Sequence, residues 1–423
     1  MEARASREQA AAGNGRALDW LNFLLADVQG GFGPFLAIYL MSSQHWKPGP
    51  IGIVLTIAGA ATVAAQVPAG ALVDAARFKR TLIALAAGIV AAAAITMALD
   101  PQFWTVAISQ AASGAADAVF PLAVTAISLG IAGREAFPGR NGRNQAWNHA
   151  GNVVTAIVSG AAGSLASPVA VLWIIAALAA ASAAAAFRIA SRDIDHDLAR
   201  GDNEGAAKAP GGLKYVLGNR KLLLFTASIT LFHFANAAML PLAGERLSQG
   251  HPQSSMLFMS ACIIIAQAVM VPMAILVGHR ADAWGRKPLF LVGFVVLPVR
   301  GLLFGVANDP YFILAIQMLD GVGAGIFGAL FSIVVADFTK GSGHFNLAQG
   351  VSSASWGLGA AFSNGAAGLI VDSLGFRTAF LFLAACAGAA FAVYWFLVPE
   401  SHGFQREEEE GGRPGLAKAG GQP

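Results

Sequence analysis

Charged residues are scarce in this sequence of 423 residues. Asp, Glu, Lys and Arg together make up 12% of it, whereas soluble domains carry about 25%. Hydrophobic residues make up 56%, and many stand in runs longer than the roughly 18 residues that mark a membrane span. Because so few charges cannot coat a water-exposed surface, the composition excludes a soluble globular protein and predicts a chain embedded in a lipid bilayer.

Cysteine and net charge are low as well. The two cysteines, Cys262 and Cys386, both lie in apolar runs, which excludes a disulfide framework and the spacing of a metal site. A formal net charge of +3, without a basic patch that carries interleaved aromatic residues, argues against a nucleic-acid partner. The sequence also lacks a phosphate-binding loop and the local pattern of a serine hydrolase. We therefore expect neither an enzyme nor a bound cofactor or metal.

Apolar runs of about 20 residues predict twelve transmembrane helices. Asp-Pro steps at 100–101 and 309–310 separate some of them. The first run is longer than a signal-peptide core and has no small-residue cleavage site, so we expect a membrane helix there. The predicted spans are 18–41, 49–73, 81–99, 103–131, 141–167, 168–190, 222–246, 254–278, 288–306, 310–337, 344–371 and 376–398.

The basic residues fall mainly on one side of these spans. Most of the 27 Lys and Arg residues precede the first span or lie in every second loop after it, and the opposite loops contain Lys47. Because Lys and Arg are enriched in cytoplasmic loops, this bias predicts that both termini are cytoplasmic. The abundance of Ala and Gly is typical of a high-GC bacterium, so we expect the inner (cytoplasmic) membrane as the location.

A polar, Gly-rich segment over 191–221 divides the chain and is typical of a flexible cytoplasmic linker. It contains DIDHD, but acids around one His in a solvated loop lack the fixed geometry of a metal site. The predicted organisation is a disordered cytoplasmic tail over 1–17, a six-helix bundle over 18–190, the linker, a second six-helix bundle over 222–398 and a disordered cytoplasmic tail over 399–423.

The two sets of six spans resemble each other. Pro34 corresponds to Pro241, and Gln110 to Gln317, at one offset of roughly 207 residues, as expected for an internal repeat. Duplicated halves of this kind enclose a site near the membrane midplane in many secondary transporters.

One motif of a Gly, an Asp and a basic cluster occurs in both halves. GHRADAWGRK at 278–287 follows span eight, and a degraded copy, GALVDAARFKR at 70–80, follows span two. The motif, its two positions and the six-plus-six spans resemble the major facilitator superfamily over essentially the whole chain. That resemblance implies an all-α integral membrane protein with twelve helices in two pseudo-symmetric halves around a central cavity. In the first copy, Arg77 and Phe78 replace the usual Gly and Arg.

The resemblance and the pseudo-symmetry predict a cytoplasmic gate at this motif. We expect its two glycines to let helices approach closely. Its two aspartates are expected to accept hydrogen bonds from the starts of spans five and eleven in the opposite half, where the helix dipole favours an anion. Such a gate forms in one conformation and breaks in the other. The predicted gate residues are Gly70, Asp74, Lys79, Arg80, Gly278, Asp282, Gly285, Arg286 and Lys287.

Four ionisable residues within the spans are functional candidates, because charges are costly there. They are Asp27, Asp117, Arg300 and Asp320, in spans one, four, nine and ten. The resemblance implies that spans one, four, seven and ten line the cavity. A carboxyl group in a low-dielectric cavity can load and release a proton near neutral pH, so Asp27 and Asp117 are predicted to couple protons or bind a cation. The alternative is that each is a structural acid bonded to neighbouring polar groups.

Arg300 and Asp320 come from consecutive spans at similar depth, so we expect them to pair, with a substrate-binding role for either as the alternative. His233 in span seven is a further cavity candidate, against the alternative of a packed, hydrogen-bonded histidine. Other polar residues expected in the lining are Asn22, Gln29, Gln110, Asn148, His149, Asn236 and Gln317.

The resemblance implies a secondary active transporter that moves a small molecule by alternating access. If Arg300 and Asp320 pair, the remaining cavity is acidic, which favours proton-coupled efflux of an amphipathic or cationic compound. The alternatives are proton symport of a small nutrient or siderophore-like ligand, uncoupled facilitation, and a transport-inactive receptor on the same fold. Span five lacks the Gly-Pro motif of many drug exporters, and span four lacks their basic residue. We expect a monomer.

Overall fold

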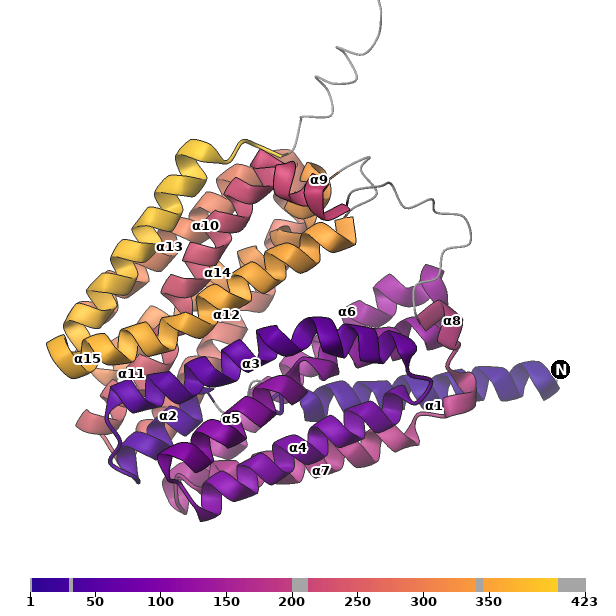
Figure 1. The fold of residues 1–423 in the computed structure, drawn as a ribbon, viewed down its shortest axis with the longest axis horizontal. Coiled ribbons are helices and arrows are strands. Elements are labelled where there is room, and N and C mark those ends of the chain that lie inside the picture. Colours follow the sequence, from indigo (N-terminus) through magenta and orange to yellow (C-terminus); the bar gives the residue numbers. More distant parts are fainter. Residues whose placement is uncertain (1, 30–32, 200–211, 340–344, 402–423) are drawn as a thin grey trace, which may run out of the picture.

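The computed structural model describes residues 2–29, 33–199, 212–339 and 345–401, and this part of the chain contains helices and no strand (Figure 1). The predicted all-α fold is confirmed. The first half contains α1 (Glu2–Leu25), α2 (Gly33–Ser42), α3 (Pro48–Ala75), α4 (Lys79–Leu99), α5 (Phe103–Asp117), α6 (Val119–Leu165) and α7 (Ala170–Arg188). A 3-10 turn (Ser191–Asp193), α8 (His196–Ala199) and α9 (Gly212–Gly218) follow. The second half contains α10 (Arg220–Ala237), α11 (Met239–Gly250), α12 (Ser255–Trp284), α13 (Arg286–Val306), α14 (Pro310–Phe338) and α15 (Phe345–Leu397).

Within the described residues, nine helical stretches are long and apolar enough to cross a membrane. The helix α6 covers parts of predicted spans four and five, and α15 covers parts of spans eleven and twelve. Each of them kinks at a glycine with positive φ: Gly133 of α6 (φ 76°) and Gly375 of α15 (φ 82°). Glycine adopts this conformation without a steric cost. The apolar stretch Leu347–Leu397 has 51 residues, or about 77 Å of helix, enough to cross a hydrocarbon core of about 30 Å twice. The helices thus fit the twelve predicted spans.

Spans one and seven are each broken at the same place in the repeat. The first is interrupted between Leu25 and Gly33, and the second at Ala238. The matched prolines Pro34 and Pro241 lie at the start of the second segment in each case. Proline has no N–H and clashes with the carbonyl of the residue four positions earlier, so it kinks or breaks a helix. The expected single helices over 18–41 and 222–246 are therefore each two shorter helices.

The amino-terminal segment also differs from its prediction. It was expected to be disordered up to residue 17, but α1 begins at Glu2. Its sequence EARASREQAAA is rich in Ala, Glu, Arg and Gln, which have high helix propensity. The acidic tail over 402–423 lies outside the described residues.

The two halves meet along three helix pairs, α2 with α11, α3 with α15, and α6 with α12 (Figure 1). A Cβ on Gly52 of α3 would overlap the backbone carbonyl of Asn364 in α15, so the backbones touch there. Thr56 adds two bonds to this contact: its hydroxyl donates to the carbonyl of Ala361 (2.8 Å) and accepts from the N–H of Gly365 (2.9 Å). The Gly- and Ala-rich spans thus act as packing faces, as small residues do between membrane helices.

These contacts lie at the end of the molecule opposite α8 and α9 (Figure 1). We call the contacts of α2 with α11, α3 with α15, and α6 with α12 the outer gate, because the basic residues predict this side to face away from the cytoplasm. In Figure 1 the halves diverge from this end toward α8 and α9. The conformation is therefore closed at the outer gate.

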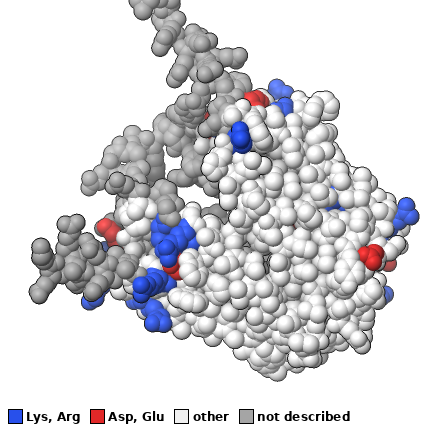
Figure 2. Space-filling model, turned by 180° about the vertical axis from the view of Figure 1, so that it is seen from behind, with Lys and Arg blue, Asp and Glu red and all other residues white. Residues whose placement is uncertain are grey.

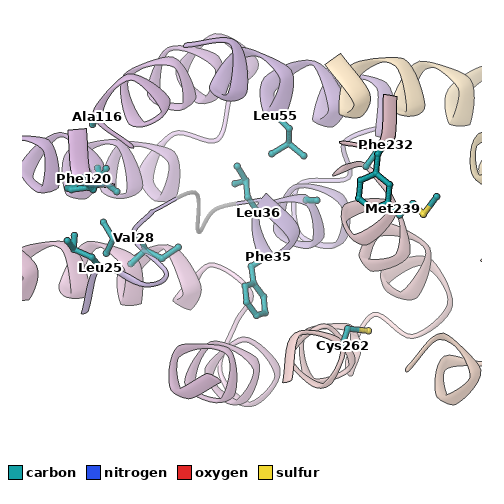
Figure 3. Packing of buried hydrophobic residues seen from close by; sticks show 14 of the residues in the cluster. Leu25, Val28, Phe35, Leu36, Leu55, Ala116, Phe120, Phe232, Met239 and Cys262 are labelled. Carbon is teal, nitrogen blue, oxygen red and sulfur yellow. The ribbon is translucent and has the colours of Figure 1, made fainter. Parts of the chain in front are cut away.

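The surface and the interior fit a membrane protein. Figure 2 shows a broad uncharged surface with Lys, Arg, Asp and Glu gathered at its ends. One buried apolar cluster runs through both halves. Figure 3 shows some of its members, which include Phe35 and Leu36 of α2, Leu55 of α3 and Met239 of α11.

Candidate functional site

A cavity of about 360 Å³ lies where the two halves meet. It is lined by residues of α2, α3 and α5 from the first half and of α10, α11, α13, α14 and α15 from the second. Both prolines at the helix breaks, Pro34 and Pro241, belong to this lining. Helices interrupted at corresponding positions of two repeats are typical of the substrate site in secondary transporters. The polar residues of the lining are Thr62, Gln110, Ser113, Asp117, Asn236, Arg300, Asp320 and Asn364.

Arg300 of α13 is the centre of a polar cluster in the second half. Its side chain is 1% exposed, and Nη1 donates to Asp320 Oδ1 (2.6 Å) and to Asn236 Oδ1 (2.6 Å). Nη2 donates to Gln317 Oε1 (2.8 Å). A buried guanidinium is tolerated only with a counter-charge and hydrogen-bond acceptors. The expected pair of Arg300 with Asp320 is present, and the cluster ties α10, α13 and α14 together.

Asp117 is the last residue of α5, where span four bends at Ala118. One turn earlier, a Cβ on Gly114 would overlap the carbonyl of Ala58 in α3, so the end of α5 is pressed against α3. This close packing places Asp117 in the cavity lining, together with Gln110 two turns away on the same helix. Gln110 is 2% exposed.

Asp27 is not among the residues that line this cavity. It lies just after the end of α1, in the break of span one, and is half-buried. Its Oδ2 atom is buried and has no hydrogen-bond partner among the described residues. Gln29 follows in the same turn, and Asn22 donates to the carbonyl of Leu18 within α1 (2.8 Å). The structure thus brings Asp117, but not Asp27, to the cavity.

His233 of α10 lines a second, smaller cavity of about 140 Å³ beside the Arg300 cluster. Its ring lies 4.4 Å from that of Phe327 in α14 and 4.3 Å from that of Trp356 in α15, centroid to centroid. Its Nδ1 is 3.0 Å from the carbonyl of Ile229, one turn earlier in α10. His233 therefore belongs to an aromatic wall next to a polar cluster.

Two other predicted lining residues lie elsewhere, on α6. Asn148 Oδ1 accepts from the side chain of Asn152 (3.3 Å). His149 interacts with Gln267 of α12, across the contact between the halves. Neither residue lines the cavity at the helix breaks.

The second copy of the repeated motif forms contacts within its own half. Gly285 (φ 82°) separates α12 from α13. The carboxylate of Glu400 accepts from the backbone N–H groups of Arg286 (3.1 Å) and Lys287 (3.0 Å) at the start of α13. Arg286 Nε lies 3.0 Å from Asp337 Oδ2, and Lys287 Nζ donates to the carbonyl of Trp395 (2.8 Å). The sequence analysis missed Glu400.

The first copy is also held within its half. Lys79 is 1% exposed and donates to the carbonyl of Ala76 (2.8 Å). Arg80 donates to the carbonyl of Ile189, just after α7 (2.5 Å).

The partners predicted for the two motif aspartates are not visible here, because the side chains of Asp74 and Asp282 lie outside the described residues. Gly70 and Gly278 do not abut the opposite half in this conformation. The gate across the halves stays a prediction for the conformation that opens the outer gate.

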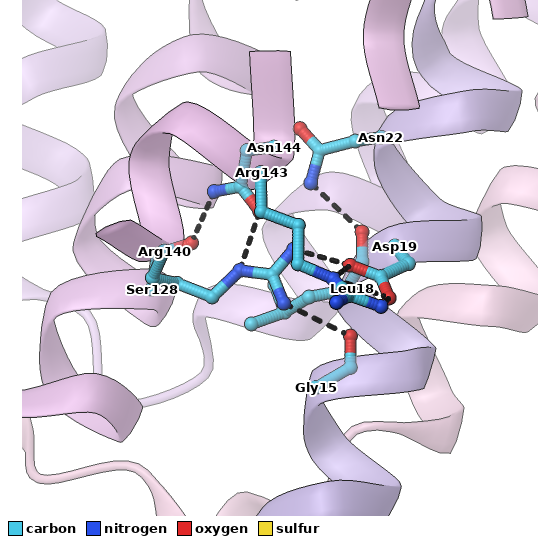
Figure 4. Close-up of polar contacts among 8 residues, drawn as sticks. All are labelled: Gly15, Leu18, Asp19, Asn22, Ser128, Arg140, Arg143 and Asn144. Atoms are coloured by element: carbon cyan, nitrogen blue, oxygen red, sulfur yellow. Dashed lines mark hydrogen bonds and ion pairs between the residues drawn. The ribbon is translucent and has the colours of Figure 1, made fainter. Parts of the chain in front are cut away.

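Two buried acidic residues in the predicted spans escaped the sequence analysis. Asp19 of α1 is 2% exposed, and its carboxylate receives Arg140 (2.5 Å) and Arg143 (2.6 Å) of α6 (Figure 4). The two arginines, three residues apart at the start of span five, were the available signal for this pairing. Glu245 of α11 is also 2% exposed. Because Glu245 lies near the end of a predicted span, the sequence did not predict that it is buried.

The comparisons of this chain with known proteins agree on one family. The model of the Major Facilitator Superfamily matches residues 19–280 and 266–420. An uncharacterized MFS-type transporter of Mycobacterium tuberculosis is 47% identical over 389 residues, which cover 91% of this chain and 93% of that protein. A multidrug transporter protein of Bacillus subtilis is 29% identical over 127 residues, which cover 30% of this chain and 23% of that protein. The crystal structure of the nucleoside transporter NupG has a TM-score of 0.76 at 16% identity and covers 90% of this chain and 98% of its own.

Proposed function

The chain belongs to the Major Facilitator Superfamily, and we propose that it exports an amphipathic or cationic compound in exchange for protons. In this proposal the substrate binds in the cavity at the helix breaks, and the halves close alternately at the outer gate and at the cytoplasmic motifs. Asp117 is the proton-binding residue of the cavity.

The observation that carries the proposal is the placement of charge in the cavity. Asp320 is the counter-charge of Arg300, so this pair adds no net charge to the lining. Asp117 contributes a carboxyl group from the opposite half. A carboxyl group in a site of low dielectric can bind either a proton or a cation, and competition between the two couples their movements.

The aromatic wall supports an amphipathic substrate. Phe327 and His233 line the smaller cavity together with Arg300 and Asp320, and the Trp356 ring packs on His233. Ligand sites combine apolar and aromatic surface with a few polar groups that fix orientation. A compound with a planar apolar part and a polar or cationic end matches this combination.

The direction of transport rests on two lines of support. The acidic lining favours exchange of a cationic compound with protons. The matching segment of the Bacillus subtilis protein, which is named a multidrug transporter, covers 30% of this chain. We therefore place export first and uptake with protons second.

Proton flux in membrane vesicles tests the proposal. Inverted vesicles with an acidic interior are challenged with pools of amphipathic, cationic and nutrient-like compounds, using the wild type and the Asp117→Asn and Asp27→Asn variants. Export predicts that a pool dissipates the gradient in the wild type and not in Asp117→Asn. Asp309→Asn, a carboxylate-to-amide change in an outer loop, is the matched control. Proton entry together with substrate in right-side-out vesicles would instead establish uptake and overturn the export proposal.

A further inference from the structure

Glu245 is a buried carboxyl group on α11, one of the helices that form the outer gate. This helix packs against α2 of the opposite half. The residue before Glu245, Gly244, lies close to both neighbouring helices, because a Cβ there would overlap the terminal methyl of Met259 in α12 and approach Ile38 of α2 to 3.2 Å. Glu245 itself is 2% exposed, and its Oε2 atom has no hydrogen-bond partner among the described residues.

No positive charge compensates Glu245 in the described part of the chain. The charged side chain that acts on it is another carboxylate, Asp372 of α15. Asp372 reaches across the gate to Gly49 at the start of α3. The neighbouring cation, Arg246, is directed to α13, where it donates to the carbonyl of Phe304 (2.8 Å) and to Asn308 Oδ1 (2.7 Å).

The helices packed against α11 contain other ionisable groups near this end of the molecule. These groups do not bond to Glu245. The Tyr39 hydroxyl of α2 accepts from Gln44 (3.2 Å), and His233 of α10 belongs to the aromatic wall. Cys262 of α12 is a buried free thiol, and Arg377 of α15 is exposed. An ionised carboxylate at Glu245 would therefore be buried without a counter-charge and beside a like charge, which is strongly unfavourable.

We propose that Glu245 is a proton-binding site of the outer gate, which carries a proton while the gate is closed and releases it when the gate opens. Opening separates α2 from α11 and exposes the carboxyl group to water, where the ionised form is stable. The closed conformation therefore binds one more proton than the open one at this residue. By linkage, acid on the outer side closes the gate and alkali opens it.

This inference goes beyond the proposed function, because it concerns the gate and does not require Asp117 to couple protons. Its test measures a distance and needs no substrate. Spin labels are placed on cysteines at Gln102, at the outer end of α5, and Gln253, between α11 and α12, in a Cys262→Ala, Cys386→Ala background. Both glutamines are exposed. Electron paramagnetic resonance then gives the distribution of label separations in nanodiscs from acidic to alkaline pH.

The wild type is expected to gain a population of longer separations as the pH rises. Glu245→Gln resembles the protonated acid and should keep the short separation throughout. Asp372→Asn removes the like charge and should weaken the pH response without abolishing it. Asp309→Asn should respond as the wild type does, because asparagine caps the start of α14 as well as aspartate does.

Two results would overturn the proposal. One is a wild-type distribution that does not change with pH. The other is a Glu245→Gln variant that opens with pH as the wild type does. If Glu245→Gln does not fold, the comparison of Asp372→Asn with Asp309→Asn decides, and equal responses in these two variants count against the proposal.

Discussion

Arg300 of α13 and Asp320 of α14 form an ion pair of 2.6 Å on the wall of the cavity where the two halves meet. The Arg300 side chain is 1% exposed and that of Asp320 is 19% exposed. Since Asn236 and Gln317 also bind the guanidinium, the pair connects three helices of the second half. Measurements of stability test the structural contribution of this cluster separately from any role in transport.

Removing one partner of the pair should destabilise the protein more than replacing both. Asp320→Asn leaves Arg300 buried without its counter-charge, and breaking buried pairs costs about 3–5 kcal/mol. The partial exposure of Asp320 and the remaining amide acceptors place the expected loss below that range. The double variant Arg300→Met, Asp320→Leu should be closer to the wild type in thermal unfolding in detergent. A double variant less stable than Asp320→Asn would contradict this account.

Gly52→Ala should prevent the outer gate from closing. Its Cβ would overlap the carbonyl of Asn364 across the contact between α3 and α15. We expect a shift of the spin-label pair at Gln102 and Gln253 to longer separations at every pH. Gly88→Ala in α4 is the matched control, because its Cβ would meet nothing within 4 Å. Equal distributions in the two variants would show that the gate closes differently.

Glu400→Gln should loosen the start of α13. The carboxylate accepts two backbone N–H groups there, and a negative charge is favoured at a helix amino terminus. Loss of such a cap costs about 0.5–2 kcal/mol. We expect a lower unfolding temperature and faster amide hydrogen exchange at Arg286 and Lys287, with the start of α14 as an internal reference. Unchanged exchange at these two residues would argue against the cap.

Trp356→Ala should weaken binding of amphipathic substrates with little change in maximal rate. The indole ring packs 4.3 Å from that of His233, which lines the smaller cavity beside the Arg300 cluster. A tenfold rise in KM corresponds to about 1.4 kcal/mol, a reasonable loss for one large aromatic contact. Trp104→Ala, at a position that is 73% exposed, provides the control. If both variants have the same KM, the aromatic wall does not bind the substrate.

The sequence predicted the spans, the repeat and the Arg300–Asp320 pair, because these depend on hydrophobic runs and on the cost of charge in a membrane. The matched Pro34 and Pro241 were visible as a repeat, but the helix breaks that they cause were not predicted. A proline inside an apolar run is compatible with a kink or a break, and tertiary contacts decide between them.

Residues near span ends were harder to interpret. Glu245 and Asp19 both lie within a few residues of a predicted boundary, where a charged side chain can usually reach water. The Glu245 side chain does not reach water, because α11 is packed against α2 and its neighbours. No sequence pattern predicts that contact. For Asp27 the error was the reverse. The family resemblance implied that span one lines the cavity, but Asp27 lies in the break of this span and outside the cavity lining.

The role of Asp117 in coupling is tested by comparing two transport modes of the Asp117→Asn variant in proteoliposomes, using a compound identified by the vesicle screen. One mode is exchange of labelled for unlabelled compound without a gradient, and the other is transport driven by a pH gradient. We expect that exchange continues while the pH gradient no longer drives net movement, because the cavity still binds substrate but cannot bind a proton. Net movement driven as in the wild type would contradict the role of Asp117 in coupling.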